Sequence, residues 1–132
     1  MRLLLDTHIW IWSVLDPTKL GHRVGEALRD ESSELWLSPI SLWELAVLSE
    51  RGRIDLDGGL WTWIDAARSS APIREAPLTG EIVRALERIE LPNRDPADRF
   101  LAATAAALDL RLVTSDAKLL SGRGYRVFSN NG

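Results

Sequence analysis

Short apolar runs alternate along the chain with segments long enough to form helices, and this alternation limits the fold more than any other feature. Runs rich in aliphatic residues are typical of buried strands, and spacers of this length allow the crossover that joins two parallel strands. The sequence therefore predicts an α/β fold with a central parallel sheet. The expected strands are 2–5, 34–38, 73–76, 111–114 and 125–128.

Helical periodicity fills the segments between these runs. Leu20, Val24 and Leu28 recur at helical spacing and predict a helix over 20–29. The clearest helix opens at Asp95-Pro96 and runs through an alanine-rich stretch, because alanine is the best helix former. The other expected helices cover 9–15, 41–51, 60–69, 80–89 and a turn at 117–120.

Length and composition bound the class of protein. A chain of 132 residues suggests a single domain over 1–132 and can bury a sufficient core without a disulfide or a structural zinc ion. The absence of cysteine excludes disulfides and thiol catalysis. No apolar run reaches the length of a membrane span, and Asp6 interrupts the N-terminal run too early for a signal peptide. We expect a cytoplasmic protein with no membrane contact.

Four acidic residues occupy comparable places in this pattern. Asp6 and Asp116 each follow an expected strand, and Glu44 and Asp98 each lie in the first turn of an expected helix. Ligands of parallel sheets bind beyond the carboxyl ends of the strands, so the fold can bring all four to one edge. Carboxylates so close repel one another unless a cation is bound, and oxygen ligands without His or Cys select Mg²⁺ or Mn²⁺.

Each acid also has a structural interpretation. Ser41 and Glu44 fit a capping box, Asp116 can cap its short helix, and Asp6 can be a turn residue. Asp95 is a good N-cap, with Asp98 then favouring the positive end of the helix. Asp6 fits its structural interpretation worst, because it lies in apolar sequence where a buried carboxylate needs a partner.

Taken together, four stretches resemble the PIN-domain family, specifically the VapC-type toxin ribonucleases of toxin–antitoxin pairs. The stretches come in the family's order and span nearly the whole chain: Leu5–His8, Ser38–Leu45, Asn93–Ala103 and Leu112–Asp116. The resemblance implies a Rossmann-like α/β/α sandwich that carries a Mg²⁺-dependent endoribonuclease site. It also implies homodimers and a cognate antitoxin whose tail wraps the toxin.

The resemblance assigns roles to individual residues. The metal-binding carboxylates would be Asp6, Glu44, Asp98 and Asp116. Thr114 would help to hold the metal or its waters, and Asp95 would first cap its helix and then support the site. His8 matches the subgroup that carries Asp-Pro-x-Asp-Arg, and it can orient a carboxylate or simply pack.

Arginines and tryptophans suggest contacts with RNA and with proteins. Arg94 and Arg99 flank the proposed site, and guanidinium groups bind phosphate bidentately, although Arg99 can equally pair with an acid of the cluster. The six tryptophans favour core or interface roles over RNA stacking. Trp61 and Trp63 cannot share a helix face, so we expect one of them to be exposed or at an interface.

Three other readings remain open at this point. A receiver-like signalling domain needs a pair of acids after the first strand, where this chain has Asp6-Thr7. A phosphatase of the haloacid-dehalogenase type needs Asp-x-Asp there, and position 8 is His. A PIN-like fold that has lost activity would serve only as a binding module, and the intact set of four acids argues against it.

Overall fold

The computed structural model describes residues 1–131 and contains a five-stranded sheet in the order β3-β2-β1-β4-β5. Every neighbouring pair of strands is parallel, as the alternation in the sequence predicts. The strands are β1 (Arg2–Leu5), β2 (Glu34–Leu37), β3 (Arg74–Glu75), β4 (Arg111–Thr114) and β5 (Arg126–Ser129).

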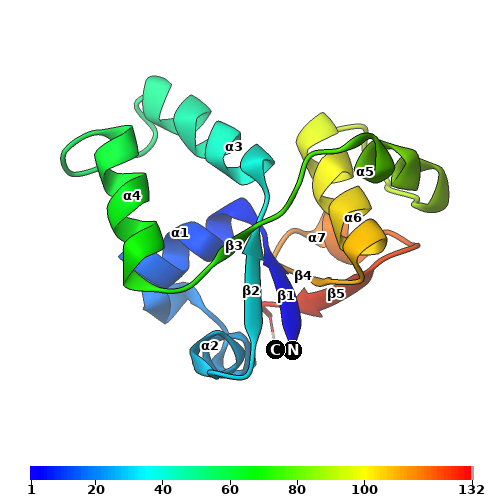
Figure 1. The fold of residues 1–132 in the computed structure, drawn as a ribbon, viewed down its shortest axis with the longest axis horizontal. Helices are drawn as coiled ribbons and strands as arrows, with labels where there is room; N and C mark the ends of the chain where they lie inside the picture. The colour runs from blue at the N-terminus through cyan, green and yellow to red at the C-terminus, as the bar shows by residue number, and fades with distance from the viewer. Residues whose placement is uncertain (132) are drawn as a thin grey trace.

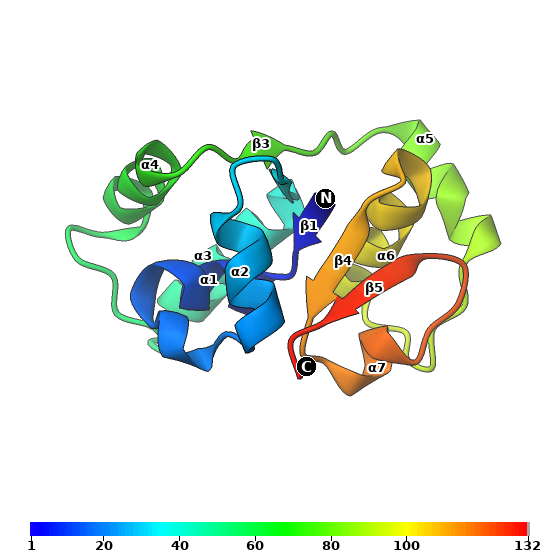
Figure 2. The ribbon, with the colours of Figure 1, turned by 90° about the horizontal axis from the view of Figure 1, so that it is seen from below.

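Helices cover both faces of this sheet and complete an α/β/α sandwich. Figure 1 and Figure 2 show α1 to α4 gathered on one side and α5, α6 and α7 on the other. The helical elements are α1 (Thr7–Leu15), η1 (Pro17–Lys19), α2 (His22–Arg29), α3 (Pro39–Glu50), α4 (Leu60–Ser70), α5 (Gly80–Arg84), η2 (Ala85–Arg88), α6 (Pro96–Leu108) and α7 (Ala117–Leu120).

The central strand β1 supplies the core on both faces. Leu3 and Leu5 belong to a buried cluster with residues of α1 to α4, such as Trp10. Leu4 points the opposite way and packs with Leu101 of α6. The alternation follows from the pleat, which sends successive side chains to opposite sides of a strand. Within residues 1–131, no helix is both long and apolar enough to cross a membrane.

The helices differ from the predicted ones mainly at their ends: α1 begins at Thr7 rather than at residue 9, and α2 begins at His22 rather than at residue 20. Two further differences have a clear cause. The N-cap of α3 is Ser38, whose hydroxyl accepts from the Ile40 N–H at 3.0 Å, so the helix begins at Pro39. The capping box of Ser41 and Glu44 is therefore wrong. The helix expected over 80–89 ends as an α-helix at Arg84 and continues as the 3₁₀ turn η2.

Candidate active site

The order of the strands creates a switch point between β1 and β4. From β1 the chain builds outward to β2 and β3, then returns to place β4 and β5 on the other side of β1. Ligands of such sheets bind at the carboxyl ends of the strands where the direction reverses. Asp6 directly follows β1, and Asp116 follows β4 by two residues. Two of the four predicted acids therefore lie at the switch point.

Asp6 is partly buried, and neutral groups of the chain hold its carboxylate. Its Oδ2 accepts from the Thr114 hydroxyl at 2.7 Å, and its Oδ1 accepts from the Thr7 N–H at 2.8 Å, which caps α1. Burial raises the pKa of Asp6, and both hydrogen bonds oppose that rise. The sequence predicts a partner for this carboxylate, and the structure supplies a hydrogen-bond donor, Thr114 of β4.

Glu44 extends from α3 toward the first turn of α1. Its Oε1 accepts from the Thr7 hydroxyl at 2.5 Å, and the same hydroxyl lies 2.9 Å from Ser41 Oγ. Thr7 and Ser41 are both buried, so this contact ties the starts of two helices together. Burial raises the pKa of Glu44, and the charges of Asp6 and Asp98 raise it further.

Asp98 lies in the first turn of α6, as predicted, and its partner is Asn93. The Asn93 Nδ2 donates to Asp98 Oδ2 at 3.0 Å. Burial again raises the pKa of Asp98, and nearby carboxylates, Asp116 and Asp6 among them, add to the effect. The acids thus act on one another electrostatically although they come from four different elements.

Two other acids act as helix caps in the structure. Asp116 Oδ1 accepts from the Lys118 N–H at 2.8 Å and caps α7. Asp95 Oδ1 accepts from the Ala97 N–H at 2.9 Å and caps α6, which confirms its predicted capping role. A cap uses only part of a carboxylate's acceptor capacity, since each oxygen has two lone pairs. His8 is exposed, with its ring centroid 5.9 Å from that of Trp12.

The donor chemistry of this edge fits a hard divalent cation. In the described chain, none of the four acids forms an ion pair with Lys or Arg, so Arg99 does not pair with the cluster. Their oxygens, with two threonine hydroxyls, are the ligand type that Mg²⁺ prefers. As they stand, however, no three acidic or histidine side chains of residues 1–131 converge into a group that could hold a metal. Each carboxylate instead turns to its own neutral donor.

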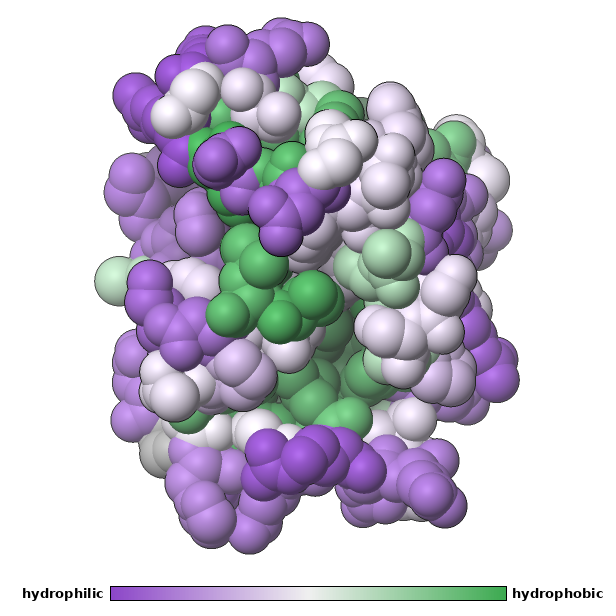
Figure 3. All heavy atoms as spheres, turned by 90° about the vertical axis from the view of Figure 1, so that its left-hand side faces the viewer, coloured by the Kyte–Doolittle hydropathy of each residue, from purple (hydrophilic) through white to green (hydrophobic). Residues whose placement is uncertain are grey.

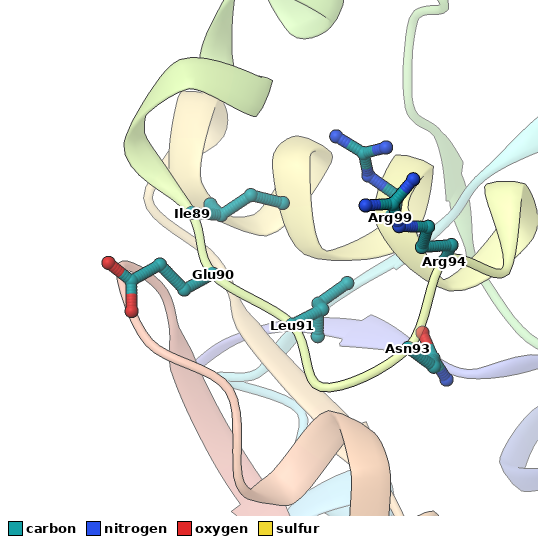
Figure 4. A pocket seen from close by; sticks show the side chains of 6 residues that line it. All are labelled: Ile89, Glu90, Leu91, Asn93, Arg94 and Arg99. Carbon is teal, nitrogen blue, oxygen red and sulfur yellow. The ribbon is translucent and has the colours of Figure 1, made fainter.

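A cavity of about 610 Å³ opens beside Asp98. It is lined by Ile89, Glu90, Leu91, Asn93, Arg94 and Arg99. Arg94 and Arg99 both line this cavity beside the start of α6, as Figure 4 shows. The predicted phosphate contacts, Arg94 and Arg99, therefore share one wall next to the acidic site.

Sequence reasoning missed how three residues of the site contact the acids or one another. The sequence suggests only a capping role for Ser41, and Thr7 and Asn93 occur only within stretches that resemble the family. For Thr7, its position next to Asp6 was the available signal, since a buried hydroxyl at the end of a strand needs a hydrogen-bond partner. Nothing in the sequence alone indicates that Asn93 reaches Asp98.

Comparison with known proteins identifies the family of this chain. The sequence model of the PIN domain matches residues 3–122. Ribonuclease VapC22 of Mycobacterium tuberculosis (strain ATCC 25618 / H37Rv) is 34% identical over 127 residues, which is 94% of this chain and 94% of that protein. The match leaves the receiver-like and phosphatase-like readings without support.

Solved structures share the fold. A chain in the crystal structure of VapBC2 from Rickettsia felis, bound to a DNA fragment from its promoter, superposes with a TM-score of 0.70 at 18% identity, covering 98% of both chains. A chain of VapBC-1 from nontypeable Haemophilus influenzae gives a TM-score of 0.63 at 16% identity over 100% of both. On the family match and the relationship to ribonuclease VapC22, this chain belongs to the PIN domain family.

Proposed function

We propose that this protein is a Mg²⁺-dependent endoribonuclease, the VapC-type toxin of a toxin–antitoxin pair. The observation that carries the proposal is the set of four carboxylates, two at the sheet's switch point and two on α3 and α6, which have no cationic side chain to neutralise them in the described chain. The relationship to a protein named a ribonuclease supports the choice of RNA.

The cation would be held by the four acids that the sequence singled out. Mg²⁺ fits these oxygen ligands, and Mn²⁺ would substitute for it. The metal site would comprise Asp6, Glu44, Asp98 and Asp116. When bound, the cation lowers the pKa of a water molecule and offsets charge on the phosphate, so that hydrolysis leaves a 3′-hydroxyl and a 5′-phosphate.

The protein's own residues orient these groups. Thr114 holds Asp6, Thr7 holds Glu44 and Asn93 holds Asp98, each through a single hydrogen bond that fixes one carboxylate oxygen. Glu44 Oε2 and Asp98 Oδ1 accept no hydrogen bond in the described chain, and Asp6 Oδ1, which accepts from the Thr7 N–H, keeps a second lone pair. These acceptors would face a shared ion. Arg94 and Arg99 would bind phosphates that flank the scissile bond.

The net charge of the chain is compatible with an RNA substrate. Sixteen basic and nineteen acidic residues give −3, which by itself disfavours nucleic acid. Setting aside the four acids of the site leaves sixteen basic against fifteen acidic residues. The acidity is therefore partly local, and a bound divalent cation would offset much of it.

An apolar groove supports the antitoxin as a partner. Figure 3 shows hydrophobic surface along a hollow on the side of the molecule that carries α1, α2 and α4. The corresponding cavity has a volume of about 360 Å³. Its apolar lining includes Trp10, Val14, Leu20, Leu28, Ala67 and Ile73. We propose that an apolar segment of an antitoxin docks here, as exposed apolar surface of this kind marks an interaction site.

A homodimer is the second proposed assembly. Trp43 on α3 is 58% exposed although its neighbour Glu44 belongs to the acidic site. Such an exposed tryptophan is typical of an interface core. Sedimentation velocity would test this directly: we expect a dimer for the wild type and a shift toward monomer for Trp43→Ser.

RNA cleavage by the purified protein tests the catalytic proposal. We expect cleavage with Mg²⁺, none in EDTA, and loss of at least about a hundredfold in rate for Asp6→Asn and Asp98→Asn. Asp65→Asn is the matched control, because it removes an exposed carboxylate on α4 far along the chain from the site. Full cleavage by Asp6→Asn would refute the mechanism. A folded, metal-binding protein that cuts no RNA would favour the inactive binding module.

A further inference from the structure

The cavity beside Asp98 has two unlike walls. Arg94 and Arg99 form the cationic wall, and both side chains are exposed. Ile89 and Leu91 form the apolar wall. Figure 4 shows both aliphatic side chains directed toward the space beside the arginines, whereas Glu90 turns the other way. A cavity of about 610 Å³ with convergent polar groups and apolar contacts is in the range of small-ligand sites.

Neither arginine is neutralised within residues 1–131. Elsewhere in the molecule, Arg2 and Arg74 share Glu34, and Arg126 pairs with Asp109. Arg94 and Arg99 have no such carboxylate within ion-pair distance in the described chain. Two guanidinium groups on one wall repel each other, and an anion placed between them would relieve that repulsion.

The apolar wall is held in place by the backbone. Glu90 and Arg123 exchange both backbone hydrogen bonds, each at 2.9 Å, which fixes the segment between Ile89 and Leu91. Gly124 makes this close approach possible: its φ is +93°, and a Cβ there would lie 2.1 Å from the Arg88 carbonyl oxygen. The wall is therefore formed before any ligand arrives.

We propose that this cavity binds one unstacked nucleotide of the RNA, with its phosphate on Arg94 and Arg99 and its base against Leu91 and Ile89. The inference rests on the proposed function and extends it to a subsite that selects which nucleotide lies next to the cleaved bond. Aliphatic contact with one face of the base and charge-assisted hydrogen bonds to the phosphate are the two interactions that the walls offer.

Asn93 connects this subsite to the acidic site. Its Nδ2 donates to Asp98, while its Oδ1 is buried without a hydrogen-bond partner and the residue lines the cavity. Buried acceptors are rarely left unpaired, so a small adjustment on binding that gives Oδ1 a donor would be favourable. A nucleotide in the cavity would then lie next to the residue that positions Asp98.

Calorimetric titration of the full-length protein in EDTA tests the subsite apart from catalysis. The probes are the four 5′-mononucleotides and inorganic phosphate. We expect the best mononucleotide to bind about tenfold more tightly than phosphate, which corresponds to a modest apolar contact. Arg94→Gln and Arg99→Gln should each weaken both probes about tenfold. Leu91→Ala should weaken the mononucleotide and leave phosphate unchanged.

The matched control is Arg53→Gln, which removes an exposed arginine in the segment after α3. The proposal is overturned if mononucleotides bind no more tightly than phosphate, or if Arg99→Gln binds them as the wild type does. The titration contains no divalent cation, so it measures nucleotide binding without cleavage. A protein that fails to cleave RNA could therefore still show the proposed binding. Conversely, if the enzyme cleaves RNA and Leu91→Ala does not change the positions at which it cleaves, the subsite is refuted and the proposed function is not.

Discussion

Thr114 donates its hydroxyl hydrogen to Asp6 Oδ2 over 2.7 Å, although 108 residues separate the two in sequence. The same Thr114 oxygen accepts the backbone N–H of Asp116 at 3.0 Å. One buried hydroxyl thus connects the ends of β1 and β4 and fixes two of the acids at the switch point. Because burial raises the pKa of Asp6 and this hydrogen bond lowers it, Thr114 helps to keep Asp6 ionised.

We predict that Thr114→Val destabilises the protein by about 1–3 kcal/mol at pH 7, because it leaves a buried carboxylate short of a donor. The loss should shrink toward pH 4, because the raised pKa of Asp6 favours its protonated form as pH falls. Urea unfolding at both values measures it. Thr104→Val is the matched control, since Thr104 is equally buried but donates only to the Phe100 carbonyl of its own helix. Equal losses in the two variants would contradict the prediction.

We predict opposite effects of Asp6→Asn on stability and on activity. The substitution removes a desolvated charge whose pKa is raised, so the metal-free protein should be more stable at pH 7 and have a higher Tm. RNA cleavage should be lost. Thermal unfolding in EDTA checks the first expectation, with exposed Asp65→Asn expected to change Tm little. A lower Tm for Asp6→Asn would show that the charge stabilises the fold.

The pH dependence of the metal-free protein follows from the same groups. The pKa values of Asp6, Glu44 and Asp98 are all raised in the fold, so it favours their protonated forms. Their stabilising contribution is complete below the ordinary values of 3.8 and 4.5, and it is lost as pH rises through the raised pKa values. We therefore predict that they make the protein less stable at pH 7 than near pH 4.

Comparison with the triple variant Asp6→Asn, Glu44→Gln, Asp98→Asn isolates this contribution. Carboxyls elsewhere whose pKa values are lowered, such as those of Asp30 and Glu34, act in the opposite direction and are common to both proteins. The difference in Tm between variant and wild type should grow from acid to neutral pH in EDTA. A difference that stays constant with pH would refute the assignment.

The sequence predicts most of the fold because its signals are local. Alanine content and the Asp95 cap place α6, and the apolar runs place β1 and β4 at the residues where the structure has them. The helix expected over 80–89 fails for a non-local reason. Glu90 pairs with Arg123, so the chain must leave helical geometry before that residue, and η2 makes the transition.

The candidate site divides in the same way. Asp6, Asp116 and Asp98 could be found because they stand at strand ends or in a first helical turn, which are recognisable in sequence. Glu44 was expected in a first turn as well, but α3 begins at Pro39 and places it beyond that turn. Their partners could not, since Thr114 reaches Asp6 only once β4 lies beside β1. The helical spacing also did not show which of Trp61 and Trp63 is exposed. In the structure Trp61 is 60% exposed and Trp63 is buried. Contacts between distant segments carry no pattern in a single sequence.

Asn130 holds the loop after α1 against the end of the sheet. Its Oδ1 accepts from the Gly21 N–H at 2.7 Å and its Nδ2 donates to the Lys19 carbonyl at 3.1 Å. We predict that Asn130→Asp costs about 1–3 kcal/mol, because the second contact then sets two oxygens against each other. Urea unfolding at pH 7 measures the cost. Exposed Asn131→Asp introduces the same charge next door and should be nearly neutral.

The last prediction concerns Mg²⁺ and the folded state. A cation that binds the native acids and not the unfolded chain stabilises by mass action, by about 2.7 kcal/mol at a concentration a hundred times its Kd. We predict that Mg²⁺ raises the Tm of EDTA-treated protein at pH 7 and that the gain shrinks toward pH 5, because protons compete for carboxylates whose pKa values are raised.

Thermal unfolding with and without Mg²⁺, for the wild type and two variants, separates a site from a general salt effect. Asp6→Asn should lose most of the gain, since it removes the most buried of the shifted acids, whereas Asp65→Asn should keep it in full. Thr114 positions Asp6 and is not one of the four carboxylates, so Thr114→Val should retain part of the gain while starting from a lower Tm. An equal gain in Asp6→Asn and wild type would rule out Asp6 as a ligand.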